Sequence, residues 1–155
     1  LMINFGSILP FSCVRRGLDA TSRKASLETA AELIATTQES IGARHLLEAL
    51  MAREKLGSTS LGDGIAIPHC RYPDCQKPVA SLLYLSDPIG FDDQNVDLLF
   101  VLVVPEQETR LHLDLLAILA RVFDRQPNAQ DLRKTRNDRE LYEVFQRQVA
   151  EALAE

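Results

Sequence analysis

The residues of this chain best suited to chemistry begin with His69, which closes the stretch GDGIAIPH. A short apolar run, Ile65–Ile67, precedes it and has the composition of a strand. Pro68 fixes one backbone angle and biases the preceding residue toward an extended conformation, so the His69 side chain leaves the strand in a defined direction. These local features leave two interpretations open: a histidine in an ordinary turn, or a catalytic group at the end of a strand.

A second histidine, His112, falls in the first turn of an expected helix. The N-terminus of a helix has free N–H groups and a partial positive charge, which disfavour protonation of an imidazole and favour nearby anions. A neutral imidazole can act as a nucleophile, a base or a hydrogen-bond donor. Position alone is equally typical of a partly buried residue without a chemical role.

An arginine and a polar loop complete a candidate anion site. Arg53 lies in the last turn of an expected helix, and Ser58 and Thr59 follow it in a loop that begins at Gly57. A guanidinium binds phosphate through a bidentate fork, and the two hydroxyls can donate hydrogen bonds. The chain has no GxxxxGK[ST] nucleotide loop and no acidic pair clearly placed for Mg²⁺. We therefore expect a phosphate site with no cofactor and no bound ATP.

The composition limits the classes of function. The chain has 155 residues, 46% of them hydrophobic, which predicts one domain over residues 1–155. Its net charge of −5 argues against a nucleic-acid partner, which requires a basic patch. The longest apolar runs are too short to span a bilayer, and the start of the chain shows no signal peptide. We expect a cytoplasmic protein that is not embedded in a membrane.

The three cysteines, Cys13, Cys70 and Cys75, form no CxxC pair. An odd number of cysteines without a secretion signal is typical of reduced cytosolic thiols. Cys70 and Cys75 lie near His69 in the sequence, but their spacing matches no common zinc pattern. No metal is therefore predicted.

The elements that must position these residues predict an α/β fold. Helices are expected at residues 4–9, 22–37, 43–56, 109–123 and 129–150. Strands are expected at residues 13–18, 65–67, 79–85 and 97–104. The last strand is apolar on both faces and is predicted to be central, and the helix capped by Thr109 is apolar nearly all round and is predicted to be buried. The order of the elements predicts a single domain with a small mixed β-sheet flanked by helices on both faces, a three-layer sandwich.

The segment REKLGSTSLGDGIAIPHC, residues 53–70, resembles the active-site segment of IIA proteins of the mannitol/fructose class in the bacterial phosphotransferase system. Within that class it is most similar to the nitrogen-regulatory branch. The similarity continues through FDDQNVDLLFVLVVPEQ and TRLHLDLLAILA and covers a core of about residues 4–149. Two positions depart from the family pattern: Asp114 often corresponds to a histidine, and Cys70 often corresponds to a glycine.

The resemblance implies a reaction and a role for each site residue. His69 is expected to take a phosphoryl group from a histidine phosphocarrier protein, with His112 beside it and Arg53 neutralising the transferred charge. Thr59 and backbone N–H groups are lesser candidates. One nitrogen of His69 attacks phosphorus, and we expect the other to carry a proton held by a backbone carbonyl.

The resemblance also implies partners. The donor protein should dock on apolar residues around the site, for which Leu61, Ile65 and Leu111 are candidates. Nitrogen-regulatory members are expected to act by binding target proteins such as potassium transporters or sensor kinases.

Three alternatives to this function remain open at this stage. The first is a sugar-specific IIA subunit for fructose or mannitol, which passes the phosphoryl group to a permease IIB domain. The second is a small metal-dependent hydrolase that uses His69, His112 and Cys70. The third is a binding module without phosphorylation, in which His69 is only structural.

Overall fold

Strand β6 is the centre of the sheet, as its apolar sequence predicts. A computed structural model describes residues 3–155 of the chain. The six strands are β1 (Val14–Leu18), β2 (Ser60–Gly62), β3 (Ile65–Ala66), β4 (His69–Tyr72), β5 (Val79–Phe91) and β6 (Gln94–Pro105). Their order across the sheet is β1-β5-β6-β3-β2. Strand β4 also pairs with β6, further along β6 than β3 does. Parallel and antiparallel pairs both occur, so the sheet is mixed.

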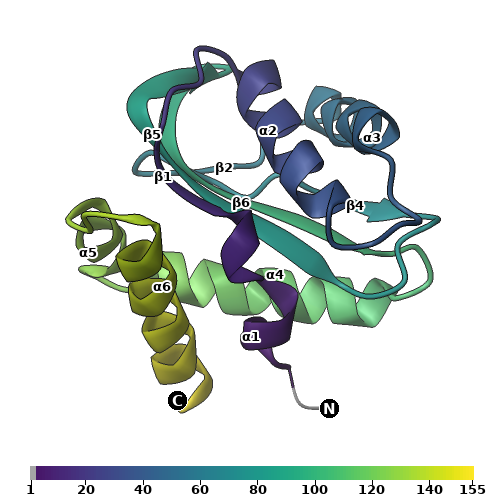
Figure 1. Cartoon of the computed structure of the whole chain (residues 1–155). Coiled ribbons are helices and arrows are strands. Elements are labelled where there is room, and N and C mark those ends of the chain that lie inside the picture. Colours follow the sequence, from purple (N-terminus) through teal and green to yellow (C-terminus); the bar gives the residue numbers. More distant parts are fainter. Residues whose placement is uncertain (1–2) are drawn as a thin grey trace.

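Helices cover both faces of this sheet, which confirms the predicted three-layer arrangement (Figure 1). They are α1 (Phe5–Ile8), α2 (Arg23–Ala35), α3 (Ala43–Lys55), α4 (Thr109–Asp124), α5 (Asn128–Arg133) and α6 (Asp138–Leu153), with a short 3₁₀ helix η1 (Phe11–Cys13) after α1. Helices α2 and α3 lie on one face, and α1, α4 and α6 lie on the other. The Ser22 side chain accepts a hydrogen bond from the Ala25 N–H at 3.0 Å and caps α2, as its residue type predicts.

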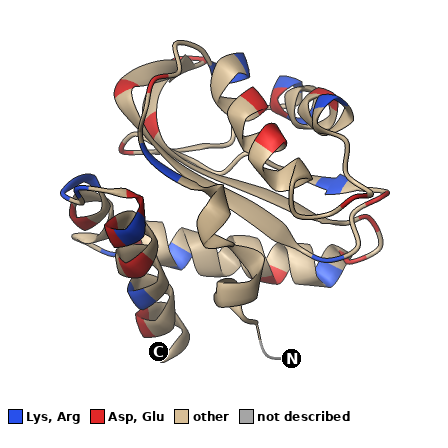
Figure 2. Ribbon diagram, viewed as in Figure 1, with Lys and Arg blue, Asp and Glu red and all other residues tan. Residues whose placement is uncertain are grey.

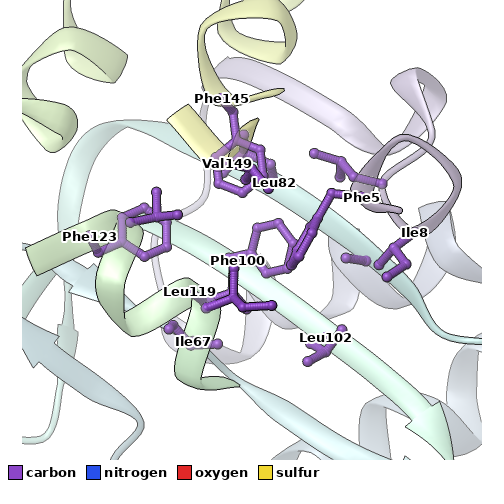
Figure 3. Packing of buried hydrophobic residues seen from close by; sticks show 14 of the residues in the cluster. Phe5, Ile8, Ile67, Leu82, Phe100, Leu102, Leu119, Phe123, Phe145 and Val149 are labelled. Carbon is purple, nitrogen blue, oxygen red and sulfur yellow. The ribbon is translucent and has the colours of Figure 1, made fainter. Parts of the chain in front are cut away.

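Side chains alternate along β6 and fill two separate cores. Phe100 and its even-numbered neighbours face α4 and α6, whereas Val101 and its odd-numbered neighbours face α2 and α3. In the first core the rings of Phe100 and Phe145 stack with centroids 5.1 Å apart, and Phe5 packs beside both rings (Figure 3). The α4 side of the sheet therefore holds the aromatic core.

Charged residues lie mainly on the helices and loops, and the middle of the sheet carries few of them (Figure 2). No helix within residues 3–155 is both long and apolar enough to cross a membrane.

The segment from Ile65 to Tyr72 is a single strand that is interrupted at Ile67 and Pro68. Ile65 pairs with Leu98 and His69 pairs with Leu102, so β3 and β4 keep the same parallel register against β6. Pro68 has no N–H to donate to the ladder, and its carbonyl accepts the Leu102 N–H at 2.9 Å. The expected end of the strand at residue 67 is only an interruption, because the strand resumes as β4 at His69.

Two other expected boundaries also change. The polar loop after Gly57 is shorter than expected, because Ser60 already belongs to β2. The strand expected at 79–85 continues to Phe91 and forms a long hairpin with β6. The shorter strand was expected from a run of apolar residues, and polar residues interrupt that run in the second half of β5.

Helix α4 is one-sided rather than buried all round. Leu115 and Leu119 are fully buried against the sheet, but Leu113 is 59% exposed. The helix covers the sheet from one side only, so leucines on its outer face remain in solvent. Its N-cap is Glu108, without a side-chain cap, so the expected Thr109 cap is also wrong.

The turn between β2 and β3 fixes the start of the segment that leads to His69. Gly64 has a φ of +79°, and a Cβ added there would lie 2.6 Å from Nη2 of Arg133 and 2.9 Å from Oδ1 of Asp97. Arg133 of α5 forms an ion pair with Asp97 at 2.9 Å and donates to the Asp63 carbonyl. Only glycine fits this backbone conformation and this space without strain.

We predict that Gly64→Ala lowers the free energy of unfolding by about 2 kcal/mol or more, because it adds left-handed backbone strain to a clash. Chemical denaturation measures this change. Gly90→Ala is the matched control, since no atom lies within 4 Å of its added Cβ. That control should change stability by less than about 0.5 kcal/mol, and equal effects of the two variants would refute the account of this turn.

Candidate active site

A groove of about 640 Å³ opens at the sheet edge formed by β4, with α3 on one side and the start of α4 on the other. It is lined by Ala49, Ala52, Arg53, Leu56, His69, Cys70, Arg71, Glu106 and His112. The structure thus brings His69, His112 and Arg53 together from three different elements. Ser58 and Thr59 do not line this groove.

The His69 imidazole is held by its own backbone. Its Nδ1 lies 2.6 Å from the Ile67 carbonyl oxygen. A carbonyl only accepts hydrogen bonds, so Nδ1 carries the proton and Nε2 keeps its lone pair. The expected backbone acceptor is thereby confirmed, and the interruption at Pro68 is what turns this carbonyl back toward the ring.

The two histidine rings pack edge to face, with centroids 5.1 Å apart and an interplanar angle of 64°. Burial, followed by the neighbouring His69, Arg71 and Arg53, lowers the pKa of His112 to about 4. Its Nε2 is buried and has no hydrogen-bond partner within residues 3–155. His112 is therefore neutral at physiological pH, and its Nε2 is a buried polar atom without a partner in the described residues.

Burial also lowers the pKa of His69, and the positive charge of Arg53 adds to this effect. The hydrogen bond to Ile67 and the negative charge of Glu54 oppose it. The net direction keeps the imidazole neutral near pH 7, which is the form that has a nucleophilic nitrogen.

Two arginines supply positive charge to the groove. Nη1 of Arg53 donates to the Gly57 carbonyl at 2.9 Å, and Nη1 of Arg71 donates to the Thr109 hydroxyl at 3.1 Å. In the part of the chain that the structure describes, neither guanidinium forms an ion pair with a carboxylate. Each guanidinium has five N–H groups, so both can still bind an anion.

Arg71 is a site residue that the sequence analysis does not predict, because it expects no strand at residues 69–72. Alternation along a strand places the side chains of residues 69 and 71 on the same side. The pattern His-Cys-Arg-Tyr alternates polar and apolar residues and was the available signal.

The hydroxyls expected to bind phosphate have other partners. The Thr59 side chain is buried, and its hydroxyl donates to the Glu54 carboxylate. The exposed Ser58 accepts the Ser60 N–H at 3.2 Å through its hydroxyl oxygen. Thr59 is therefore a structural residue of the loop in this conformation, since its one O–H is already donated.

Cys70 points to the opposite side of β4 from His69 and belongs to the core under α2 and α3. Burial raises its pKa to about 12, so the thiol is protonated and unreactive at physiological pH. This explains why a cysteine is tolerated beside His69. The other departure, Asp114, forms an exposed ion pair with Arg110 at 3.1 Å.

Within residues 3–155 no group of three or more His, Cys, Asp and Glu side chains is arranged to hold a metal ion. The thiol of Cys70 faces away from the two histidines. The three side chains considered as metal ligands of a hydrolase, His69, His112 and Cys70, therefore do not point to one place.

Comparison with known proteins places this arrangement in a family. Residues 7–148 match the family described as "Phosphoenolpyruvate-dependent sugar phosphotransferase system, EIIA 2". A nitrogen regulatory protein of Pseudomonas aeruginosa is 45% identical over 126 residues, which cover 79% of this chain and 82% of that protein. A nitrogen regulatory protein of Escherichia coli is 38% identical over 147 residues, which cover 92% of this chain and 90% of that protein.

A solved structure leads to the same assignment. The crystal structure of the nitrogen regulatory protein IIA-Ntr from Neisseria meningitidis superimposes with a TM-score of 0.85 at 34% identity, covering 91% of this chain and 98% of that chain. The agreement extends over the sheet and the helices on both of its faces. The chain therefore belongs to the EIIA type 2 family of the phosphotransferase system, in which it is similar to nitrogen regulatory proteins.

Proposed function

We propose that this protein accepts a phosphoryl group on Nε2 of His69 from a phosphohistidine of a carrier protein. The observation that carries the proposal is the 2.6 Å contact between Nδ1 and the Ile67 carbonyl, which leaves the Nε2 lone pair free in a groove with two arginines. Membership of the EIIA type 2 family supports the same reaction.

The reaction needs no cofactor and no net proton transfer. A bond forms between Nε2 of neutral His69 and phosphorus as the bond between phosphorus and the donor nitrogen breaks. The donor ring, whose other nitrogen carries a proton, leaves with the electron pair of that bond as a neutral imidazole, and the His69 ring takes over the positive charge. Nδ1 of His69 keeps its proton throughout, held by the Ile67 carbonyl.

Charge neutralisation and positioning dominate catalysis of such a transfer, because the transferred group is loosely bound and highly charged in the transition state. Arg53 and Arg71 supply fixed positive charge at the groove. His112 supplies a neutral ring nitrogen that can carry the N–H needed to donate to a phosphoryl oxygen.

The donor has an apolar surface on which to dock. Leu56 on the groove wall is 84% exposed, and Leu113 extends from the outer face of α4 one residue beyond His112. Of the residues expected for this purpose, Leu61 is exposed and Leu111 is half-buried, but Ile65 is buried and is withdrawn. Exposed leucines next to arginines that form no ion pair in the described residues are suited to transient binding of a protein partner.

The similarity to nitrogen regulatory proteins supports a regulatory role. We propose that the phosphorylated and free forms differ in their binding of target proteins in the cytoplasm, such as potassium transporters or sensor kinases. Addition of about two negative charges to a groove of two arginines changes its surface charge strongly. Transfer onward to a permease IIB domain is the second candidate, and membership of a sugar phosphotransferase system family supports it.

Phosphorylation itself is tested by intact mass. Incubation with enzyme I, a histidine phosphocarrier protein and phosphoenolpyruvate should add one acid-labile phosphoryl group, which is absent from His69→Ala. His45→Ala is the matched control, because His45 is an exposed histidine of α3 outside the groove, and it should be modified as the wild type is. Folded wild-type protein that accepts nothing from any carrier pair would contradict the proposal.

The role of Arg53 is tested by single-turnover kinetics. Arg53→Ala should slow phosphoryl acceptance by about thirtyfold to a thousandfold, equivalent to roughly 2–4 kcal/mol of transition-state stabilisation, as for other lost donors to a developing charge. Arg136→Ala is the control, since Arg136 is exposed and pairs only with Glu140, at 3.1 Å. Equal rates for the wild type and both variants would remove Arg53 from the mechanism.

The protonation state of His112 is tested by NMR titration. Its ring resonances should remain those of a neutral imidazole as the pH falls from about 8 to about 5, because its pKa is lowered to about 4. Protonation should appear only below that range. A midpoint near the ordinary histidine value of 6.5 would show that burial and the neighbouring cations do not act on the ring as described.

A further inference from the structure

Glu54 is the only acidic side chain that is buried within residues 3–155, at 4% exposure. It follows Arg53 at the end of α3, and the turn of about 100° per residue directs the two side chains to different places. Arg53 lines the groove, whereas Glu54 lies beneath the loop that follows α3. A buried carboxylate is destabilising unless charged and polar groups compensate it.

Three donors compensate this carboxylate. Nη1 of Arg23 lies 3.2 Å from Oε1, the backbone N–H of Thr59 lies 3.5 Å from the same oxygen, and the Thr59 hydroxyl donates to Oε2. Arg23 also pairs with Asp92 at 2.8 Å and lies over the Phe91 ring, which anchors it to the hairpin of β5 and β6. The carboxylate therefore fixes both the side chain and the backbone of Thr59.

The backbone of Thr59 continues this network to the active site. Its carbonyl accepts the N–H of Ile67 at 3.1 Å. The carbonyl of Ile67 in turn accepts the Nδ1 proton of His69 at 2.6 Å. A continuous series of hydrogen bonds thus connects the Glu54 carboxylate with the imidazole, through Thr59 and Ile67.

We propose that Glu54 is a positioning residue for His69: by holding Thr59 it fixes the Ile67 peptide, and that peptide sets the tautomer and direction of the imidazole. This rests on the proposed function, because the residue it positions is the phosphoryl acceptor. Hydrogen bonds in such a series polarise one another, so the charge of the carboxylate strengthens each link.

A purely structural interpretation assigns Glu54 a different purpose. In that view its ion pair with Arg23 only holds α3 against α2 and the hairpin. Loss of the carboxylate would then lower stability without changing the tautomer of His69. The two interpretations predict different results for changes at Thr59, because its hydroxyl belongs to the hydrogen-bond series but takes no part in the ion pair.

The test compares Thr59→Val, which removes the hydroxyl at nearly constant shape, with Thr59→Ser, which retains it. Glu54→Gln removes the charge, and Asp92→Asn is the control, because it removes an exposed partner of the same Arg23. The tautomer of His69 is read from the ¹⁵N shifts of its ring nitrogens in the unphosphorylated protein. The rate of phosphoryl acceptance is read in a single turnover, and thermal unfolding reports on the fold.

Thr59→Val and Glu54→Gln should shift His69 away from the tautomer protonated at Nδ1 and slow acceptance by about tenfold or more, as expected when a reacting group loses its alignment. Thr59→Ser and Asp92→Asn should keep the wild-type tautomer and rate. If Glu54→Gln fails to fold, the two Thr59 variants decide the question.

Folded Thr59→Val and Glu54→Gln with the wild-type tautomer and rate would overturn the positioning role, even if both are less stable. Wild-type protein that accepts no phosphoryl group would overturn the proposed function instead. The ¹⁵N measurement is made without phosphorylation and judges the positioning of His69 in either case.

Discussion

The hydrogen bond between the Ile67 carbonyl and Nδ1 of His69 is the interaction on which the site depends, because it determines which ring nitrogen carries the proton and which keeps a lone pair. A carbonyl two residues earlier in a regular strand would not reach the ring. The interruption of the strand at Ile67 and Pro68 makes this contact geometrically available, and the register with β6 is recovered directly afterwards. The strand is thus irregular at these two residues, and the regular pairing on either side keeps them in place.

The rest of the fold brings charge to that imidazole. Helices on opposite faces contribute Arg53 and His112, and they meet only because β4 lies at the edge of the sheet. The same edge strand contributes Arg71. Burial keeps both imidazoles neutral while the guanidiniums remain charged, so the groove combines a nucleophile with a fixed positive field. Such an arrangement supports the phosphoryl transfer between histidines that we propose.

Most of the fold could be predicted because its pattern is strong. The apolar run of β6 marked the central strand, and helix spacing with caps such as Ser22 located the helices. His69, His112 and Arg53 stand out in the sequence by their types and positions, and they line one groove in the structure, while their roles stay a prediction. The strand β4 was missed because a proline normally ends a strand, and Arg71 was missed with it. The role of Thr59 was also missed, because its hydroxyl could be assigned only once the buried Glu54 was known.

The central claim is that Nε2 of His69 accepts the phosphoryl group, and the most direct measurement is the ¹⁵N and ³¹P NMR spectrum of phosphorylated protein with labelled histidine. Coupling between phosphorus and nitrogen identifies the ring atom that carries the group. We predict a single phosphohistidine, at His69, with phosphorus on Nε2 and the proton on Nδ1. Phosphorus on Nδ1 of His69, or on another histidine, would contradict the account.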